Sequence, residues 1–257
     1  MLKGKTAFIT GTNRGLGRTL LTEFVRNGAN VIAHVRSECR VKSDDDCSNT
    51  IPFDEWCDQV AKKYGVFVRP IYFDMTDYDA MESSVEKLID EGIRIDVLIN
   101  NAGVGKWGYF QLMSMDVVRS TMEVNLFAPM TLTQHLLRYM ISKGGGSIVN
   151  IASIAGIDLN AGNCAYGVSK AALVAFTKTL AAEAGIFKVR VNAIAPGMMK
   201  TDMGNILGEK EAERSIKGSP LNRLCTVEDV ASAAVFLSSD RSSYINGQVI
   251  VLDGGKR

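Results

Sequence analysis

A glycine-rich turn near the start of the chain is the feature that most restricts its possible folds. The segment Thr10-Gly-Thr-Asn-Arg-Gly-Leu-Gly17 follows a short β-rich run at 6–9 and opens an amphipathic stretch at 15–27. Glycines let a backbone pass close to a pyrophosphate, and the free N–H groups of a helix N-terminus favour its negative charge. Glycines alone would be weak evidence, since a tight turn needs them for steric reasons too. Strand, turn and helix together predict a phosphate-binding unit.

Strand-like and helical patterns alternate along the rest of the chain. The runs at 96–100 and 147–151 are mostly apolar, which is typical of strands buried on both faces of a parallel sheet. The alternation predicts an α/β fold, with one Rossmann-type domain over residues 1–257 and a doubly wound, seven-stranded parallel sheet flanked by helices. We expect strands near 6–10, 30–35, 67–73, 95–100, 147–152, 188–194 and 248–252, and helices near 15–27, 53–64, 77–91, 114–142, 165–184 and 227–238.

Tyr166 and Lys170 lie four residues apart in a predicted helix and therefore share one face of it. An ammonium beside a phenol can lower the phenol pKa from about 10 toward neutrality, which would suit a proton donor to a carbonyl. Ser153 follows the strand expected at 147–152 and could hold the same carbonyl oxygen. The pair alone is also compatible with a buried helix that carries Tyr and Lys by chance.

Several motifs together resemble the short-chain dehydrogenase/reductase family over essentially the whole chain. They occur in the family's order: Thr-Gly-x-x-x-Gly-x-Gly at 10–17, Asn-Asn-Ala-Gly at 100–103, Ser153, Tyr166-x-x-x-Lys170 and Pro196-Gly197. Asn125, in Glu-Val-Asn-Leu, is similar to the family's fourth catalytic position. The stretch at 244–255 looks most like the branch that contains bacterial 3-oxoacyl-acyl-carrier-protein reductases.

The resemblance implies an NADP-dependent oxidoreductase that acts on CH–OH and C=O groups. In the family's scheme, Tyr166 is the general acid or base, Lys170 tunes it and holds the nicotinamide ribose, Ser153 polarises the carbonyl and Asn125 holds a relay water. The expected reaction is NADPH-dependent reduction of a 3-oxoacyl thioester or related ketone. Oxidation of a sugar, a steroid or another secondary alcohol stays open. A non-catalytic nucleotide-sensing or scaffold protein also stays open. Such a protein would be expected to have lost part of the catalytic tetrad, which here consists of Asn125, Ser153, Tyr166 and Lys170.

The end of the second expected strand indicates which cofactor is bound. NAD-binding relatives carry an acidic residue there that binds the ribose 2′-hydroxyl, but this chain has Val35 followed by Arg36. Arg14 and Arg36 could pair with a 2′-phosphate, which favours NADP(H), although both could also be ordinary solvated side chains. The cofactor contacts implied by the resemblance are Gly11, Asn13, Arg14, Gly15, Leu16, Gly17, Arg36, Asp74, Met75, Asn101, Ala102, Gly103, Tyr166, Lys170, Pro196, Gly197 and Thr201.

Three segments are expected to wall the substrate pocket, and their apolar side chains favour a ketone with an apolar arm over a free sugar. The expected wall residues are Trp107, Tyr109, Phe110, Leu159, Asn160, Asn163, Cys164, Met198, Met199, Met203, Ile206 and Leu207. An acyl carrier protein is left open as a partner. Two positions that carry arginine in the fatty-acid reductases hold Gly144 and Phe187, although Lys143 and Lys188 lie beside them.

Charge and composition exclude several other classes. The 257 residues carry 29 Lys and Arg against 28 Asp and Glu, so no basic field is available for nucleic acid or an anionic membrane. The first strand is expected so close to Met1 that we expect no signal peptide, and no apolar run reaches the roughly 18 residues that span a bilayer. Five cysteines without a pattern fit reduced thiols. We therefore expect a cytoplasmic protein. The small-residue helix at 165–184 permits close packing, which could be packing against the sheet, and the resemblance to the family implies that it helps to form a homodimer or homotetramer.

The resemblance implies that the chain is longer around 37–52 than other members of the family, and a surface loop near the adenosine end is expected. A metal site from His34, Cys39, Cys47 and Cys57 is the alternative, but the spacings match no zinc module, so no metal is expected. His34 and His135 are expected to be packed or solvated rather than catalytic.

Overall fold

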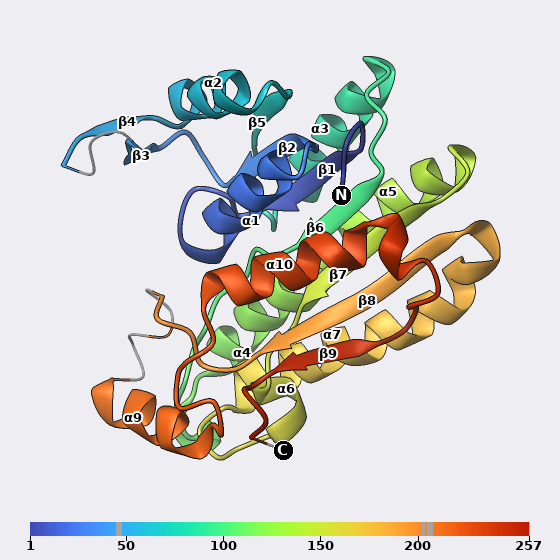
Figure 1. Cartoon of the computed structure of the whole chain (residues 1–257). Coiled ribbons are helices and arrows are strands. Elements are labelled where there is room, and N and C mark those ends of the chain that lie inside the picture. The colour runs from blue at the N-terminus through green and yellow to red at the C-terminus, as the bar shows by residue number, and fades with distance from the viewer. Residues whose placement is uncertain (45–47, 202–203, 205–207, 257) are drawn as a thin grey trace.

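Seven parallel strands form the central sheet, in the order β5–β2–β1–β6–β7–β8–β9 (Figure 1). The computed structural model describes residues 1–44, 48–201, 204 and 208–256. The strands of the sheet are β1 (Thr6–Thr10), β2 (Asn30–Val35), β5 (Val68–Tyr72), β6 (Val97–Asn100), β7 (Gly146–Ile151), β8 (Val189–Pro196) and β9 (Val249–Leu252).

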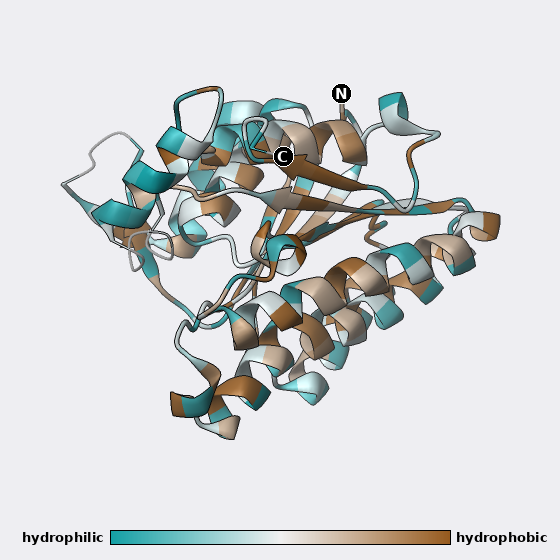
Figure 2. Cartoon of the chain, turned by 90° about the horizontal axis from the view of Figure 1, so that it is seen from below, coloured by the Kyte–Doolittle hydropathy of each residue, from teal (hydrophilic) through white to brown (hydrophobic). Residues whose placement is uncertain are grey.

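Helices cover both faces of this sheet because successive strand residues point to opposite sides. Ala7 and Ile9 belong to the core beneath one helical layer, whereas Phe8 between them belongs to the core beneath the other. Figure 2 shows the apolar strands between the two layers. The first layer holds α1 (Gly15–Arg26), α2 (Phe53–Tyr64) and α10 (Val227–Ser238), and the second holds α3 (Tyr78–Asp90), α5 (Ala128–Ser142) and α7 (Cys164–Ala184). The predicted doubly wound parallel α/β sheet is confirmed.

The helix predicted at 114–142 is interrupted at the turn that carries Asn125, a predicted catalytic residue. It consists of α4 (Met115–Met122), a π-helical turn η2 (Glu123–Phe127) and α5. A π turn inserts one extra residue into the helix, and such turns often occur at functional sites. The inserted turn carries Asn125 and buries it completely. Prediction of one regular helix was wrong here, because apolar periodicity does not register one extra residue.

The segment expected to be a surface loop is partly regular structure. β3 (Arg40–Lys42) and β4 (Thr50–Pro52) form an antiparallel pair of their own. Val41 and Ile51 are paired and buried, while the residues on either side of each are exposed. Arg18 of α1 fixes this hairpin, because its guanidinium lies 4.4 Å from the Trp56 ring and donates to the carbonyl of Lys42. The loop prediction therefore missed a short strand pair.

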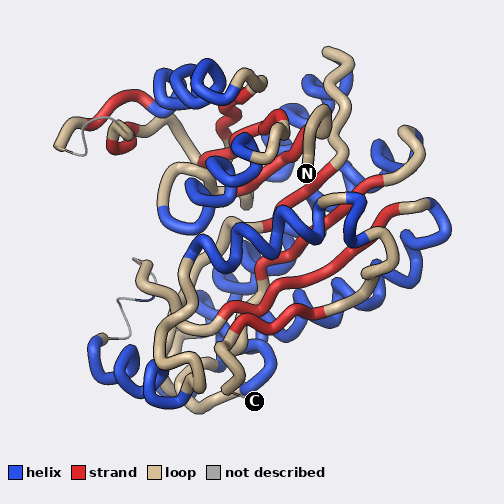
Figure 3. The backbone as a smooth tube through the Cα atoms, viewed as in Figure 1, coloured by secondary structure: helices blue, strands red, loops and turns tan. Residues whose placement is uncertain are grey.

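Shorter elements complete the chain (Figure 3). They are η1 (Phe110–Leu112), α6 (Ala155–Asp158), η3 (Gly185–Phe187), α9 (Glu209–Gly218) and η4 (Asp240–Ser242). No helix in the described part of the chain is long and apolar enough to cross a membrane.

Candidate active site

The sequence motifs meet at the carboxyl edge of the sheet, beside the point where its strand order reverses. On one side of β1 lie β2 and then β5, and on its other side lie β6, β7, β8 and β9. Crevices at such switch points bind ligands in open α/β sheets. Thr10 ties the two loops of the crevice together, because its Oγ1 accepts hydrogen bonds from the backbone N–H groups of Asn101 and Ala102, both at 2.9 Å. Asn101 Nδ2 also donates to the Thr10 carbonyl at 2.8 Å.

The glycine-rich turn has the form that a phosphate site requires. Gly11 and Gly15 have φ values of +72° and +51°, which favour glycine. A Cβ on Gly17 would lie 1.8 Å from the Gly11 carbonyl oxygen, so α1 can pack against the turn only with glycine there. Among the described residues, the side chain of the N-cap residue Arg14 makes no capping bond and the first turn of α1 carries no acid. Its N-terminal N–H groups are therefore suited to an anion.

The buried ammonium of Lys170 lies beside Tyr166 on α7. Lys170 is 4% exposed, and its Nζ donates to the Ile151 carbonyl at 2.8 Å. The same Nζ lies 5.9 Å from the centroid of the Tyr166 ring. Burial lowers the pKa of Lys170 to about 8, because an ammonium is less stable away from water. The predicted juxtaposition of phenol and ammonium is thus present.

The predicted direction of the Tyr166 pKa shift is wrong in this structure. Burial raises the pKa of Tyr166, and a hydrogen bond with the Ser153 side chain opposes that rise only in part. The free-energy cost of taking a phenolate out of water is larger than the stabilisation that the nearby Lys170 ammonium gives to it. The tyrosine is therefore protonated at neutral pH. Ser153 is its hydrogen-bond partner, a contact that sequence reasoning did not predict.

Asn125 joins the loop after β6 to α7. Its Oδ1 accepts from the Val104 N–H at 2.8 Å, and its Nδ2 donates to the Val104 carbonyl at 2.9 Å and to Ser169 Oγ at 3.0 Å. Ser169 Oγ in turn donates to the Tyr166 carbonyl at 2.7 Å. Sequence reasoning missed Ser169, which lies between the Tyr and the Lys and carries no motif of its own. The Asn125 side chain thus contacts protein groups on both sides of the site.

Gly103 leaves room beside these groups. A Cβ there would lie 3.2 Å from Asn125 Oδ1 and 3.5 Å from Lys170 Nζ. A side chain at this position would fill the space in front of the ammonium. The absence of one keeps that space open to a ligand.

The adenosine edge of the predicted site lies at the ends of β2 and β5. Arg36 directly follows β2 and is exposed, and Arg14 in the glycine-rich turn is exposed as well. Hydrogen bonds from the Thr76 N–H and hydroxyl lower the pKa of Asp74, and the charge of Arg36 adds to the effect.

Other predicted contacts reach the site in different ways. Leu16 and Met75 bury their side chains in the core, so only their backbone atoms can face a ligand. Gly197 is held by donation of its N–H to the Leu252 carbonyl at 2.8 Å, and Thr201 Oγ1 accepts from the Gly204 N–H at 3.2 Å.

The expected substrate walls are brought together only in part. The Trp107 ring lies 5.7 Å from the Tyr166 ring, at an interplanar angle of 49°. The Gly108 N–H donates to the Gly162 carbonyl at 2.9 Å, which joins two of the expected walls. Tyr109, Phe110 and Leu159 are exposed. Met203, Ile206 and Leu207 lie outside the described residues.

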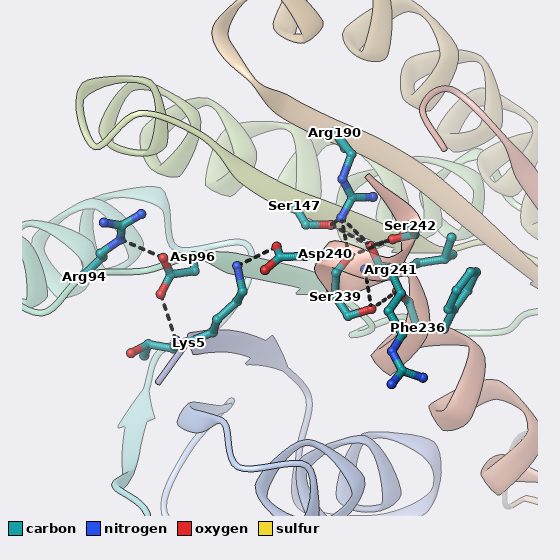
Figure 4. A network of polar contacts seen from close by, with 12 residues as sticks. Lys5, Arg94, Asp96, Ser147, Arg190, Phe236, Ser239, Asp240, Arg241 and Ser242 are labelled. Carbon is teal, nitrogen blue, oxygen red and sulfur yellow. Dashed lines mark hydrogen bonds and ion pairs between the residues drawn. The ribbon is translucent and has the colours of Figure 1, made fainter. Parts of the chain in front are cut away.

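Polar groups line a cavity of about 690 Å³ at the opposite, amino edge of the sheet. Figure 4 shows the ion pairs Lys5–Asp240, at 2.9 Å, and Arg94–Asp96, at 2.6 Å. Arg190 donates to the Leu237 carbonyl at 2.8 Å and packs the end of α10 onto the sheet. Gly144 and Lys188 also line this cavity, so the region compared with the carrier-docking positions of the fatty-acid reductases lies here.

The described residues do not support the alternative of a metal site near His34. Within residues 1–44, 48–201, 204 and 208–256, no group of three or more His, Cys, Asp or Glu side chains could hold a metal ion. Cys47 lies outside the described residues.

Comparisons with known proteins agree with this geometry. The sequence model of the family described as enoyl-(acyl carrier protein) reductase matches residues 11–257. The 3-oxoacyl-[acyl-carrier-protein] reductase FabG of Thermotoga maritima is 37% identical over 254 residues, which cover 99% of this chain and 98% of the relative.

Two solved structures show the range of similar enzymes. A putative NAD(P)-dependent gluconate 5-dehydrogenase from Beutenbergia cavernae with bound NADP has a TM-score of 0.87 and 33% identity, covering 99% of this chain and 97% of its own. A 7α-hydroxysteroid dehydrogenase in complex with NADH and a 7-oxo bile acid has a TM-score of 0.85 and 30% identity, covering 99% and 94%.

Proposed function

Because the chain belongs to the short-chain dehydrogenase/reductase family, we propose that it uses NADPH to reduce a substrate carbonyl to a secondary alcohol, with Tyr166 as the proton donor. The observation that carries this proposal is the contact between half-buried Tyr166, its hydrogen-bond partner Ser153 and the buried ammonium of Lys170. When bound, NADPH would supply the hydride.

The proton chemistry follows from the two pKa shifts. A raised pKa keeps the Tyr166 phenol protonated at neutral pH, so it holds a proton to give as negative charge develops on the carbonyl oxygen. Lys170, with a pKa of about 8, is still mostly an ammonium at neutral pH and would stabilise the phenolate that remains. Ser153 would hold the same oxygen. A water relay past Asn125 stays a prediction.

The residues present fit NADP(H). The α1 N-terminus offers backbone N–H groups, and Gly103 leaves space beside Lys170 for a nicotinamide ribose. Val35 has no carboxylate to repel a 2′-phosphate, and Arg14 and Arg36 are the groups that would pair with it. The other proposed contacts are Gly11, Asn13, Gly15, Leu16, Gly17, Asp74, Met75, Asn101, Ala102, Pro196, Gly197 and Thr201. A similar solved structure holds NADP, which supports the choice.

The substrate we favour is a 3-oxoacyl thioester or a related ketone with an apolar arm. Trp107 beside Tyr166 supplies one apolar wall, and the similar enzymes include 3-oxoacyl-[acyl-carrier-protein] reductases. A secondary alcohol of a sugar or a steroid is the second candidate, because gluconate and hydroxysteroid dehydrogenases have similar structures. A purely nucleotide-sensing protein is disfavoured by the intact tetrad.

An acyl carrier protein could donate the substrate only under one geometric condition. Phe187 follows α7 (Cys164–Ala184), and the helix spans roughly 27 Å from Tyr166 to its end, at a rise of about 1.5 Å per residue. A carrier docked beside Gly144 and Phe187 would therefore lie far from Tyr166 of the same chain, and a second chain would have to accept the acyl group. Exposed Met115, Phe127 and Met130 offer an apolar surface for the proposed homodimer or homotetramer. A cytoplasmic location stays a prediction.

The test is a screen for loss of NADPH absorbance with 3-oxoacyl thioesters, steroid ketones and keto sugars. The proposal expects turnover of a 3-oxoacyl thioester, and activity on a steroid or sugar alone would select the second candidate. Comparing kcat/KM for one 3-oxoacyl group on carrier protein and on a truncated thioester would decide the carrier question. No gain from the carrier would reject that role, and no turnover of any carbonyl would reject the function.

A further inference from the structure

His34 is a buried polar residue for which the proposed mechanism has no use. It lies on β2, two residues before Arg36, and is 1% exposed. Its position is next to the edge of the sheet, because β2 pairs with β1 on one side and with the edge strand β5 on the other.

The two ring nitrogens of His34 contact two different segments. Nε2 lies 2.9 Å from the Phe73 carbonyl oxygen, which can only accept, so this nitrogen carries the hydrogen. Nδ1 is then the acceptor, and the Gly11 N–H donates to it at 3.3 Å. The ring also lies against the Phe73 ring, with centroids 4.1 Å apart. A neutral imidazole therefore connects the glycine-rich turn to the end of β5.

At Phe73 a backbone bond to β2 accompanies the imidazole contact, but that bond is long. The Gly11 and Thr12 N–H groups also donate to the His34 carbonyl, at 2.9 and 3.0 Å, so the turn is held to β2 without the ring. β5 has a single neighbour in the sheet, and the bond from the Phe73 N–H to the Val35 carbonyl is already long, at 3.3 Å. The hydrogen bond from the His34 ring to the Phe73 carbonyl is the second connection between Phe73 and β2.

The residue after Phe73 is Asp74, at the adenosine edge. Its carboxylate lies close enough to Arg36 for that charge to help lower its pKa. Burial lowers the pKa of His34 to about 4, so the ring stays neutral and keeps the same hydrogen-bond pattern at neutral pH. A displacement of the β5 end would move Asp74 relative to Arg36 and to the glycine-rich turn.

We propose that His34 is a positioning residue for the adenosine half of the cofactor, which acts by fixing the end of β5 against β2 and the glycine-rich turn. The proposal rests on the NADP(H) assignment above. It differs from a general packing role, because a loosened core would weaken every part of the site, whereas loss of this bridge should affect the adenosine end alone.

The test compares three ligands on four proteins. Adenosine 2′,5′-bisphosphate probes the adenosine half, reduced nicotinamide mononucleotide probes the other half, and NADPH probes both. The proteins are the unmodified chain, His34→Leu, His34→Gln and Ile32→Val. Ile32 is fully buried on the same strand and in the same core layer as the Phe73 ring, so Ile32→Val controls for a loosened core. Calorimetry gives each dissociation constant.

Loss of a hydrogen bond of this kind corresponds to an effect of about tenfold. His34→Leu should weaken adenosine 2′,5′-bisphosphate and NADPH by about that factor and leave the mononucleotide within twofold. His34→Gln keeps a donor for the Phe73 carbonyl and should recover most of the loss, and Ile32→Val should bind all three ligands normally. Equal loss for both halves, or normal binding by His34→Leu, would overturn the proposal.

A second comparison tests the proposal if His34→Leu does not fold. If His34→Leu is unfolded, His34→Asn takes its place, because the shorter amide can accept from Gly11 but cannot reach Phe73. His34→Asn should then lose adenosine bisphosphate affinity relative to His34→Gln, and equal binding by the two would refute the role. Failure of the unmodified chain to bind NADPH would instead reject the proposed function.

Discussion

The buried ammonium of Lys170 should give the protein a distinctive dependence of stability on pH. Its pKa falls from the ordinary 10.5 to about 8 in the folded chain. Between those values the unfolded chain binds more protons than the folded one, so the free energy of unfolding should rise with pH there. Below about pH 8 the folded protein keeps a charge away from water. Replacing Lys170 with Met removes this titration while leaving a side chain of similar length.

The size of the effect follows from the shift. The fall of the Lys170 pKa from 10.5 to about 8 corresponds to about 3 kcal/mol between the charged and the neutral buried side chain. Only part of this free-energy difference appears as added stability between pH 7 and 9. Integrating the proton difference over that window gives about 1 kcal/mol. The unmodified protein should therefore gain about 1 kcal/mol relative to Lys170→Met as the pH rises from 7 to 9.

Urea unfolding at pH 7 and pH 9 measures this difference, at one protein concentration, because association shifts apparent stability. Other titrating groups are common to the two proteins and cancel. Lys178→Met, at an exposed position of the same helix, is the matched control and should follow the unmodified protein. A stability difference between Lys170→Met and the unmodified protein that is the same at both pH values would refute the buried-ammonium account.

Three further outcomes follow from the site. Arg36→Ala should weaken NADPH binding by roughly ten- to a hundredfold and leave NADH binding nearly unchanged, and equal dissociation constants for the two cofactors in the unmodified protein would contradict the assignment. Gly103→Ala places a methyl group 3.5 Å from Lys170 Nζ, so kcat/KM should fall at least about tenfold with little change in Tm; full activity would show that this space is not used. The rate of carbonyl reduction should fall as the pH rises past about 8, where Lys170 loses its proton, and a flat profile from pH 7 to 10 would count against its role.

Much of the fold could be predicted because its signals are local. Buried parallel strands give continuous apolar runs, and the glycines of the first turn are required by φ values and by a close backbone approach that no other residue allows. The extra residue of the π turn around Asn125 and the pairing of Val41 with Ile51 depend on contacts that the local pattern does not contain. For the same reason His34 looked like an ordinary packed residue.

The candidate site was predicted by position but not in its electrostatics. The spacing of Tyr166 and Lys170 correctly placed them side by side on one helix. It could not indicate that Lys170 is buried and Tyr166 half-buried, and desolvation determines the direction of both pKa shifts. Ser169 was missed because its role depends on the fold of η2 beside α7.

Turnover by Tyr166→Phe tests the central claim most directly. The substitution removes the phenolic oxygen and keeps the ring that lies against Trp107. With chemistry shown to be rate-limiting, we expect kcat for carbonyl reduction to fall by at least about a hundredfold while the dissociation constant of NADPH stays within a few fold. A variant that binds NADPH and keeps a tenth or more of kcat would place the proton donor elsewhere.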